Sequence, residues 1–315
     1  MKVLFVSSGN TAFGVSPITK NQGDSLALSG VEMSYFPITG RGLLNYTKNI
    51  IRLKCHLSRY KYDIVHAHYS LTAFVSTVAY AKPLIVSLMG SDIKLNCLTK
   101  LFVKIFSRFF WARTIVKSYK MGNSLGLSNI FVIPNGVDVK VFKSIERSFC
   151  QKESGWDLNK KHILFAAKPS RPEKNFVLAE QAFSLISDDN INLHSLIDVM
   201  PEQVPLLMNS ADVVLLVSLW EGSPNVIKEA MACNRPIVST DVGDVRWVFG
   251  DTPGCYVASF DPDDVATKLK KALEFSEQHH QTSGRERIMA LGLDSESTAR
   301  RIIAVYQSVL DENVQ

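Results

Sequence analysis

The chain has 315 residues, of which 46% are hydrophobic and 21% are charged. This composition excludes a disordered or collagen-like chain, and the length predicts two globular domains. Five cysteines lie scattered without a Cys-x-x-Cys pair, which favours reduced thiols in a cytoplasmic protein. No apolar run is long enough to predict a transmembrane helix, and the N-terminal MKVLFVSSGN predicts a first strand rather than a signal peptide.

Charge is distributed unevenly along the chain. Residues 1–145 hold 18 lysine and arginine residues against 5 acidic residues, whereas the remainder holds 17 against 25. This asymmetry supports two domains with different partners, and the basic N-terminal half is expected to attract an anionic one. Charge alone does not distinguish nucleic acid, phospholipid headgroups and a phosphate-bearing substrate.

Short apolar runs alternate with helix-like stretches along most of the chain. Strands are predicted at residues 3–7, 32–38, 63–68, 83–88, 114–117, 130–133, 162–167, 192–197, 213–217, 236–240 and 255–257. The predicted helices include residues 43–59, 98–111, 176–186, 201–209, 225–232, 263–275 and 296–310. Continuously apolar strands such as VVLLV indicate a sheet that is covered on both faces, and strand–helix alternation indicates that the sheet is parallel.

The alternation occurs twice, which predicts an α/β protein with two doubly wound, Rossmann-like domains. The strand pattern lapses at 137–156, after the turn signal Asn135-Gly136, so the domains are placed at 1–145 and 146–315. The last predicted helix, 296–310, carries apolar residues at helical spacing and fits either domain.

The segment richest in chemistry is 218–245, which follows the apolar run VVLLV. Ser223 is a predicted N-cap, Pro224 suits the first helical position, and Gly222 lets a ligand approach the backbone closely. We therefore expect a helix N-terminus with free N–H groups at the carboxyl end of a buried strand. Such a corner suits an anion or sugar hydroxyls.

Two carboxylates, Glu221 and Glu229, flank this corner. Eight helical residues rotate the chain by about 80° net, so both side chains can face the same side. Carboxylates accept paired hydrogen bonds from vicinal diols such as those of ribose and hexoses. Alternatively, Glu221 complements the helix dipole and Glu229 is a solvated helix residue, and the residues alone leave both interpretations open.

The stretch EGSPNVIKEAMAC, from Glu221 on, resembles the E-x7-E motif of the retaining glycosyltransferases of family 4. Four further segments resemble this family in the expected order: DIVHAHY (63–69), PLIVSLMGSD (83–92), IFVIPNGVD (130–138) and KPSRPEKN (168–175). The resemblance implies a GT-B fold, in which two Rossmann-like domains face each other across a cleft. It also implies that the N-terminal domain binds the acceptor and the C-terminal domain binds a nucleotide sugar.

The resemblance implies roles for the residues of the E-x7-E segment. Glu221 would contact the donor sugar hydroxyls near the reacting carbon, and Glu229 would hold the nucleotide ribose. The backbone of the corner would bind the sugar and the phosphates, except at the proline, which has no N–H. The residues of that corner are Gly222, Ser223, Pro224, Asn225 and Val226.

By the same resemblance, Arg171 and Lys174 would neutralise the diphosphate leaving group, with Lys168 as an alternative to Arg171. Fixed cations lower the barrier where negative charge develops in a reaction. From the residues alone, this stretch could equally be a solvated loop. His68 would contact the donor sugar from the other domain, with His66 as the alternative. Gly14 would correspond to the family's glycine loop near the donor phosphates, although the usual glycine pair is absent.

The resemblance implies a hexosyltransferase-like enzyme of polysaccharide, cell-envelope or glycolipid biosynthesis. Such an enzyme transfers a sugar from a nucleotide-diphosphate sugar to a glycan or lipid-linked acceptor, with retention of anomeric configuration. No tightly bound cofactor and no metal are expected. The acidic run DPDD (261–264) is accordingly interpreted as a helix cap. Two alternatives are a nucleotide-sugar epimerase of the same fold and a catalytically silent subunit that binds nucleotide sugar or lipid. The sequence names neither the sugar and base of the donor nor the linkage.

The helix at 98–111 gathers Lys100, Lys104 and Arg108 on one side together with Trp111, and three phenylalanines on the other. Either the apolar side covers the sheet and the charged side faces water, or the basic side lies on an anionic membrane. The second interpretation predicts a cytoplasmic protein bound peripherally at the inner face of the membrane. Nucleic acid is not an expected partner, since no nucleic-acid-binding module is recognised.

Overall fold

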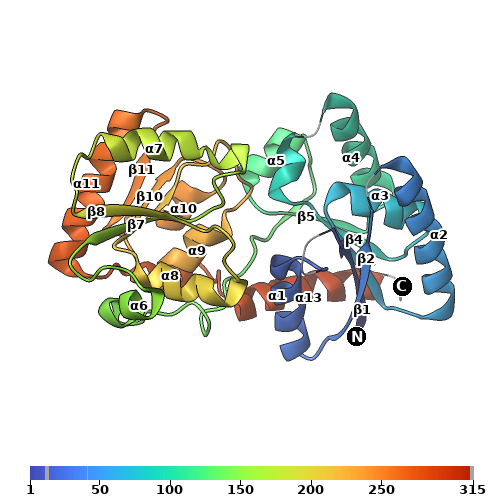
Figure 1. Cartoon of the computed structure of the whole chain (residues 1–315). Helices are drawn as coiled ribbons and strands as arrows, with labels where there is room; N and C mark the ends of the chain where they lie inside the picture. Colours follow the sequence, from blue (N-terminus) through green and yellow to red (C-terminus); the bar gives the residue numbers. More distant parts are fainter. Residues whose placement is uncertain (11–13, 41, 95, 313–315) are drawn as a thin grey trace. The chain divides into compact units, whose positions relative to one another are not determined.

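The computed structural model describes residues 1–10, 14–40, 42–94 and 96–312. The chain divides into two compact units, each an α/β structure around a parallel sheet (Figure 1). The first unit comprises Met1–Gly136 with Ser295–Gln315, and the second comprises Val137–Asp294. No helix of the described ranges is both long and apolar enough to cross a bilayer.

The first unit has a six-stranded sheet in the order β2-β1-β3-β4-β5-β6. Its strands are β1 (Lys2–Ser8), β2 (Glu32–Ile38), β3 (Ile64–His68), β4 (Leu84–Ser87), β5 (Arg113–Val116) and β6 (Phe131–Val132). Its helices are α1 (Pro17–Leu28), α2 (Leu43–Arg59), α3 (Ser70–Val78), the 3-10 turn η1 (Gly90–Lys94), α4 (Cys97–Phe109), α5 (Tyr119–Leu125) and α13 (Ser295–Glu312).

Both faces of this sheet are buried, as the continuous apolar strands predicted. Successive side chains of a strand point to opposite faces, so Val3 and Phe5 join one core while Leu4 and Val6 join the other. The first core lies under α1 and α13 and the second under α2, α3 and α4.

The second unit has a five-stranded sheet in the order β11-β10-β9-β7-β8. Its strands are β7 (Lys161–Phe165), β8 (Ile191–Ser195), β9 (Val213–Leu216), β10 (Ile237–Thr240) and β11 (Cys255–Ala258). Its helices are α6 (Arg147–Ser154), η2 (Pro172–Lys174), α7 (Phe176–Ser184), η3 (Pro201–Gln203), α8 (Val204–Ser210), α9 (Asn225–Ala232), α10 (Val245–Phe249), α11 (Pro262–His279) and α12 (Gly284–Ala290).

The boundary between the units lies earlier than the predicted division after residue 145. The Val137 N–H donates to the Leu293 carbonyl at 2.9 Å, and the side chains of Val137 and Phe142 are buried in the core of the second unit. The segment after Gly136 therefore belongs to the second unit, because its apolar side chains are buried there. The last helix, α13, packs on the first unit through Ile302, Tyr306 and their neighbours.

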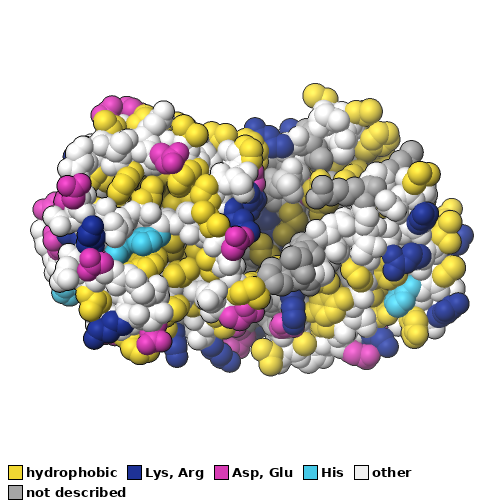
Figure 2. All heavy atoms as spheres, in the orientation of Figure 1, with side chains coloured by type: hydrophobic (Ala, Val, Ile, Leu, Met, Phe, Trp, Pro, Cys, Tyr) yellow, Lys and Arg dark blue, Asp and Glu magenta, His cyan; other side chains and the backbone are white. Residues whose placement is uncertain are grey.

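The first of the two arrangements predicted for helix α4 places its apolar side, with all three phenylalanines, on the sheet. The observed helix is oriented differently. Val103 is buried and Phe106 packs against the core, but Phe102 and Phe109 are 45% and 70% exposed. Trp111 does not lie on the basic side: it is buried and donates to the Thr77 hydroxyl at 3.0 Å. With Trp111 and Phe106 packed against Phe74, the other phenylalanines stay outside, and apolar side chains gather over α4 at the upper right of Figure 2.

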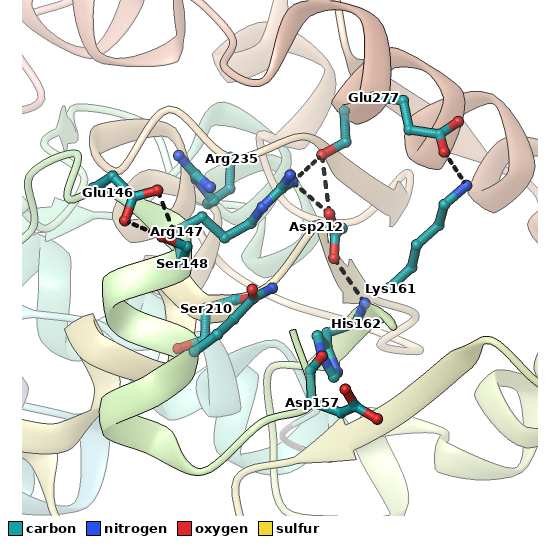
Figure 3. Close-up of polar contacts among 12 residues, drawn as sticks. Glu146, Arg147, Ser148, Asp157, Lys161, His162, Ser210, Asp212, Arg235 and Glu277 are labelled. Atoms are coloured by element: carbon teal, nitrogen blue, oxygen red, sulfur yellow. Dashed lines mark hydrogen bonds and ion pairs between the residues drawn. The ribbon is translucent and has the colours of Figure 1, made fainter. Parts of the chain in front are cut away.

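A polar network fastens the amino ends of the strands in the second unit (Figure 3). Asp212, just before β9, pairs with Arg147 and accepts the His162 N–H at 2.8 Å. Arg147 also donates to the Ser276 hydroxyl of α11 at 2.8 Å. The network ties α6, α11, β7 and β9 together at the edge opposite the carboxyl ends of the strands, so its role is structural.

Candidate functional site

The predicted site residues come from loops where the strand order of each sheet reverses. In the second unit this point lies between β7 and β9, and the loops that follow these strands carry Lys174 and Glu221. In the first unit it lies between β1 and β3, whose following segments carry Gly14 and, at the end of β3 itself, His68. Open parallel sheets bind ligands at this point, at the carboxyl ends of their strands.

Lys174 and Glu221 form an ion pair between the two loops of the second unit. Their side chains are only 12% and 17% exposed, and the Ser218 hydroxyl donates to the same Glu221 oxygen at 2.9 Å. The Leu219 N–H donates to the Glu173 carbonyl at 2.9 Å, which joins the loops through their backbones as well. The structure thus brings together the two segments that the sequence singled out separately.

The other two cations predicted for this site do not contact Glu221 in the described structure. The Arg171 guanidinium pairs with Glu173, with Nη2 at 2.6 Å, and its side chain is 56% exposed. The Lys168 Nζ lies 3.4 Å from Asp198, and both side chains are exposed. Since exposed pairs are weakly bound, both cations remain available to an anionic ligand.

Helix α9 spans Asn225–Ala232, the predicted range, with Pro224 as its N-cap rather than its first helical residue. The prediction of a Ser223 cap is wrong, because Pro224 is extended, with a ψ of 121°, and is itself the residue before the helix. The Ser223 hydroxyl instead accepts a hydrogen bond from the Lys228 Nζ at 3.1 Å. The first helical N–H groups, which begin at Asn225 and Val226, follow directly on the buried Gly222 corner.

A second loop, which belongs to the segment 218–245 but was given no role from the sequence, lies against this corner. Gly243 follows β10 with a φ of +59°, and a Cβ at this position would lie 2.8 Å from the Gly222 carbonyl oxygen. The two backbones therefore approach too closely for any side chain. Thr240 adds a hydrogen bond from its hydroxyl to the Ser218 carbonyl at 2.8 Å. The pair of loops holds the Gly222 corner in place.

Glu229 and Lys228 are adjacent residues of α9 with opposite charges and shifted pKa values. Glu229 is half-buried, and burial raises the pKa of its carboxyl to about 7, against the opposing effect of Lys228. Lys228 is buried, which lowers the pKa of its ammonium to about 8 despite the nearby carboxylates of Asp244, Glu229 and Glu221. Sequence reasoning missed Lys228, although a lysine inside the apolar stretch NVIKEAMA is an available signal.

The two histidines of β3 differ in their hydrogen bonds. His66 is bonded at both ring nitrogens, Nδ1 to the Tyr306 hydroxyl at 2.6 Å and Nε2 to the Ser87 hydroxyl at 2.8 Å. His68 is buried and stacks on His66 with ring centroids 4.4 Å apart, but within the described ranges neither of its ring nitrogens has a partner. Burial, with a smaller effect of Lys117, lowers the pKa of His68 to about 3, so its ring is neutral.

The segment before α1 contributes Gly14, which has a φ of +72°, and a Cβ there would touch no atom of the described residues within 4 Å. The adjoining residues 11–13 of the predicted phosphate loop lie outside the described residues. Asp92 was not singled out from the sequence as a separate residue. It is buried, accepts the Ser70 N–H at 3.2 Å and the Met89 N–H at 2.7 Å, and so ties the loops after β3 and β4. Burial raises the pKa of Asp92 to about 6.

The acidic run before α11 caps that helix, as predicted. Asp261 is the N-cap and accepts the Asp263 N–H at 3.2 Å, while Asp264 accepts the Ser259 N–H at 2.7 Å. In the parts of the chain that the structure describes, no three His, Cys, Asp or Glu side chains gather into a cluster that could hold a metal ion.

Two family models match the chain, one in each unit. Residues 15–141 match the model described as Glycosyltransferase Family 4, and residues 177–274 match the model described as Glycosyl transferases group 1. The chain is also similar in sequence to curated glycosyltransferases. A putative teichuronic acid biosynthesis glycosyltransferase of Bacillus subtilis is 26% identical over 215 residues, which are 60% of this chain and 55% of that protein.

A UDP-Gal:alpha-D-GlcNAc-diphosphoundecaprenol alpha-1,3-galactosyltransferase of Escherichia coli is 24% identical over 278 residues, which are 74% of this chain and 72% of that protein. Apart from this galactosyltransferase, the curated relatives are matched over about half of their own length.

Solved structures share the fold at low sequence identity. Sucrose-phosphate synthase from Thermosynechococcus elongatus superposes with a TM-score of 0.83 at 14% identity, covering 99% of this chain and 100% of that one. HepE of Anabaena, in complex with UDP and glucose, gives a TM-score of 0.73 at 16% identity, covering 98% and 100%. With two parallel-sheet units, a matching family model in each and these structural neighbours, the chain belongs to the family 4 glycosyltransferases of the GT-B fold.

Proposed function

We propose that the chain is an active retaining glycosyltransferase that moves a sugar from a nucleotide-diphosphate sugar to an acceptor hydroxyl. The observation that carries this proposal is the Lys174–Glu221 ion pair at the point where the strand order of the second sheet reverses. A cation and a carboxylate side by side suit a donor that presents a diphosphate next to a sugar. The structural neighbour HepE is recorded with UDP and glucose, and one relative is named for a UDP-sugar donor.

Lys174 would act on the leaving group. An ammonium has three N–H donors, so its bond to Glu221 leaves two for diphosphate oxygens. Negative charge on the diphosphate grows as the glycosidic bond breaks, and a fixed cation then stabilises the transition state more than the ground state. Arg171 would add a second cation once a ligand competes with Glu173 for its guanidinium. These two side chains would supply the positive charge without a metal or a tightly bound cofactor.

The carboxylates and the corner would hold the rest of the donor. Glu221 would accept hydrogen bonds from sugar hydroxyls, and Glu229 would accept them from the ribose diol. The N–H groups at the start of α9, from Asn225 and Val226, would bind phosphate or sugar oxygens, with Gly222 and Ser223 giving close backbone access and Pro224 ending the extended segment.

His68 is proposed to contact the donor sugar. It is neutral and, within the described structure, has unpartnered ring nitrogens, so one can donate to a hydroxyl and the other can accept from one. His66 is fully bonded within the first unit and is the less suitable of the two. Gly14 is proposed to border the donor phosphates, because an open position with positive φ leaves room for a ligand.

The acceptor is proposed to be a glycan or a lipid-linked saccharide. Two relatives are named for teichuronic acid biosynthesis and for a diphosphoundecaprenol substrate. The proposal includes a peripheral position at the inner face of the membrane, with Lys100, Lys104 and Arg108 toward anionic lipid. Such a row of cations is attracted to the negative surface of a membrane.

The proposal is tested in two steps. Nucleoside diphosphates and their sugars are screened by thermal shift, and the best donor is assayed for sugar release and for transfer to glycan and lipid-linked acceptors. We expect one nucleotide class to raise the melting temperature and the product to retain its anomeric configuration by NMR. An absence of stabilisation by every nucleotide would contradict the proposal, and an epimerised donor formed without acceptor would favour the epimerase alternative.

Lys174→Met is expected to lower kcat by more than tenfold while nucleotide affinity changes less, because its charge acts mainly on the transition state. Lys270→Met is the control, since Lys270 is an exposed lysine of α11 that is given no role at the donor. Steady-state kinetics and calorimetry measure the two quantities. Equal kcat in wild type and Lys174→Met would remove Lys174 from the mechanism.

A further inference from the structure

Helix α4 presents three different faces along its length. One face, with Val103 and Phe106, packs on the core of the first unit. A second face is basic, with residues at spacings of four: Lys100, Lys104 and Arg108. The third face is apolar and solvent-exposed, and comprises Leu98, Leu101, Phe102, Ile105 and Phe109. A monomeric soluble surface rarely gathers so many large apolar side chains on one helix, which indicates a contact surface.

A groove of about 600 Å³ runs beside this helix, within the first unit. It is lined by the basic and apolar sides of α4, by residues 111–114 at the start of β5 and by the loop 126–129 before β6. It therefore lies at the amino ends of β5 and β6, whereas His68 lies at the carboxyl end of β3. The groove and the candidate site thus occupy opposite edges of the same sheet.

Positive charge gathers in the groove. Three cations line it, and none of its described lining residues is acidic. Arg113 is already paired, with Glu312 of α13, but Lys104 and Arg108 form no ion pair within the described ranges. The Lys104 Nζ rests against Gly126, at 3.1 Å from where a Cβ would be, so a left-handed glycine makes room for it.

The surrounding chain carries almost no balancing charge. Residues 64–137 hold eight lysine and arginine residues and one acidic residue, Asp92, which is buried. Two cations without a carboxylate partner suit a phosphate group, and an adjacent row of exposed apolar side chains suits hydrocarbon. One ligand that presents both chemistries side by side is a phospholipid at the surface of a bilayer.

We propose that this groove binds the phosphate headgroup of an anionic phospholipid, with Lys104 and Arg108 on the phosphate and the apolar face of α4 among the acyl chains. The proposal deepens the membrane position proposed above, on which it rests, because it assigns a site with a fixed stoichiometry in place of a diffuse attraction. It does not depend on the transferase reaction.

The test uses the full chain and dihexanoyl-phosphatidylglycerol below its micellar concentration, so that no charged surface is present. Titration calorimetry compares wild type with Lys104→Gln, Arg108→Gln and Lys100→Gln. Lys100 is the matched control, because it belongs to the same basic face but does not line the groove. We expect one lipid per chain, a loss of affinity of tenfold or more in the first two variants, and less than twofold in Lys100→Gln.

Two further ligands test the contributions of the acyl chains and of the headgroup charge to binding separately. Glycerol 3-phosphate, which lacks acyl chains, and dihexanoyl-phosphatidylcholine, which is zwitterionic, should each bind at least tenfold more weakly than the anionic lipid. Equal losses in all three variants, or binding as tight to glycerol 3-phosphate, would overturn the groove as a phospholipid site.

Pelleting with phosphatidylglycerol vesicles distinguishes the proposed phospholipid site in the groove from the peripheral membrane position proposed above. If wild type and all three variants bind vesicles and lose that binding equally with salt, the membrane position holds and the groove is wrong. If neither wild type nor any variant pellets with the vesicles, the proposed membrane position is wrong, and the phospholipid site that rests on it is wrong as well. Thermal denaturation checks that the three substitutions leave the fold intact.

Discussion

Two residues of the second unit with pKa values shifted toward neutral pH are neighbours on α9. Burial moves the pKa of Glu229 up to about 7 and the pKa of Lys228 down to about 8, so both titrate close to neutral pH. The ionised carboxylate can accept from both hydroxyls of a ribose diol through its two oxygens, whereas protonation turns one of these oxygens into a donor. We therefore expect nucleotide affinity to rise as pH increases through about 7.

Glu229→Gln tests this pKa through stability. The carboxyl has a pKa of about 7 in the folded chain and about 4.5 when unfolded, so the unfolding free energy of wild type falls as pH rises from about 4.5 to about 7. The glutamine variant lacks this fall. Because Glu229 is partly exposed, the variant should gain about 1–2 kcal/mol on wild type between pH 5 and pH 8. Urea denaturation at each pH measures the gain, and parallel pH profiles would contradict the assigned burial effect.

At the scale of elements, the corner of the site depends on two loops in backbone contact. Gly243 lies against Gly222 with no space for a Cβ, and the donor proposal needs the Gly222 corner undistorted. The first helical N–H groups of α9 follow from that corner, so a shift of the loop after β10 would misplace them. The candidate site thus involves three loops of the second sheet, and the third, after β10, lies within the segment 218–245 but was given no role from the sequence.

Gly243→Ala should displace this corner. The left-handed φ costs an alanine about 1–2 kcal/mol, and the clash with the Gly222 carbonyl adds to that. We expect nucleotide affinity to fall at least tenfold by calorimetry. Gly155→Ala is the control, because Gly155 also has a positive φ, of +71°, but a Cβ there meets no atom within 4 Å in the part of the chain that the structure describes. Backbone strain should destabilise both variants, but only Gly243→Ala should weaken nucleotide binding. Comparable nucleotide affinities in the two variants would refute the role of the contact.

The strands were predictable because each buried strand of a parallel sheet is a continuous apolar run. The prediction of 213–217 against the observed Val213–Leu216 is typical. The orientation of α4 was not predictable, since its phenylalanines fit either the core or a surface, and only the packing of Trp111 and Phe74 decides which. The Lys174–Glu221 contact was likewise beyond sequence reasoning, because it joins loops that are 47 residues apart.

At the scale of the whole molecule, two successive α/β patterns predicted two doubly wound units. The boundary was misplaced because the segment after Asn135-Gly136 has no periodic pattern, while its place is decided by a few contacts such as Val137 with Leu293. The placement of α13 was left open for a similar reason: its apolar stripe fits any sheet face. In the structure it completes the first unit, so the two ends of the chain meet in one core.

Tyr306→Phe tests how α13 stabilises that unit. The Tyr306 hydroxyl bonds the buried His66 Nδ1 at 2.6 Å, and its loss would leave this nitrogen without a partner. We expect the unfolding free energy to fall by about 1–3 kcal/mol. The loss should be equal at pH 6 and pH 8, because burial holds the pKa of His66 well below this range and that of Tyr306 well above it.

Hydrogen exchange should show faster opening of β1 and β3 and no change in β7. The exposed Tyr119, replaced by phenylalanine, serves as the control and should change nothing. Because His66 also stacks on His68, a weakened His66 in Tyr306→Phe should loosen the end of β3 that carries the proposed sugar contact. An equal loss of protection in β7, or a loss confined to pH 6, would contradict an anchor that acts through a neutral hydrogen bond inside the first unit.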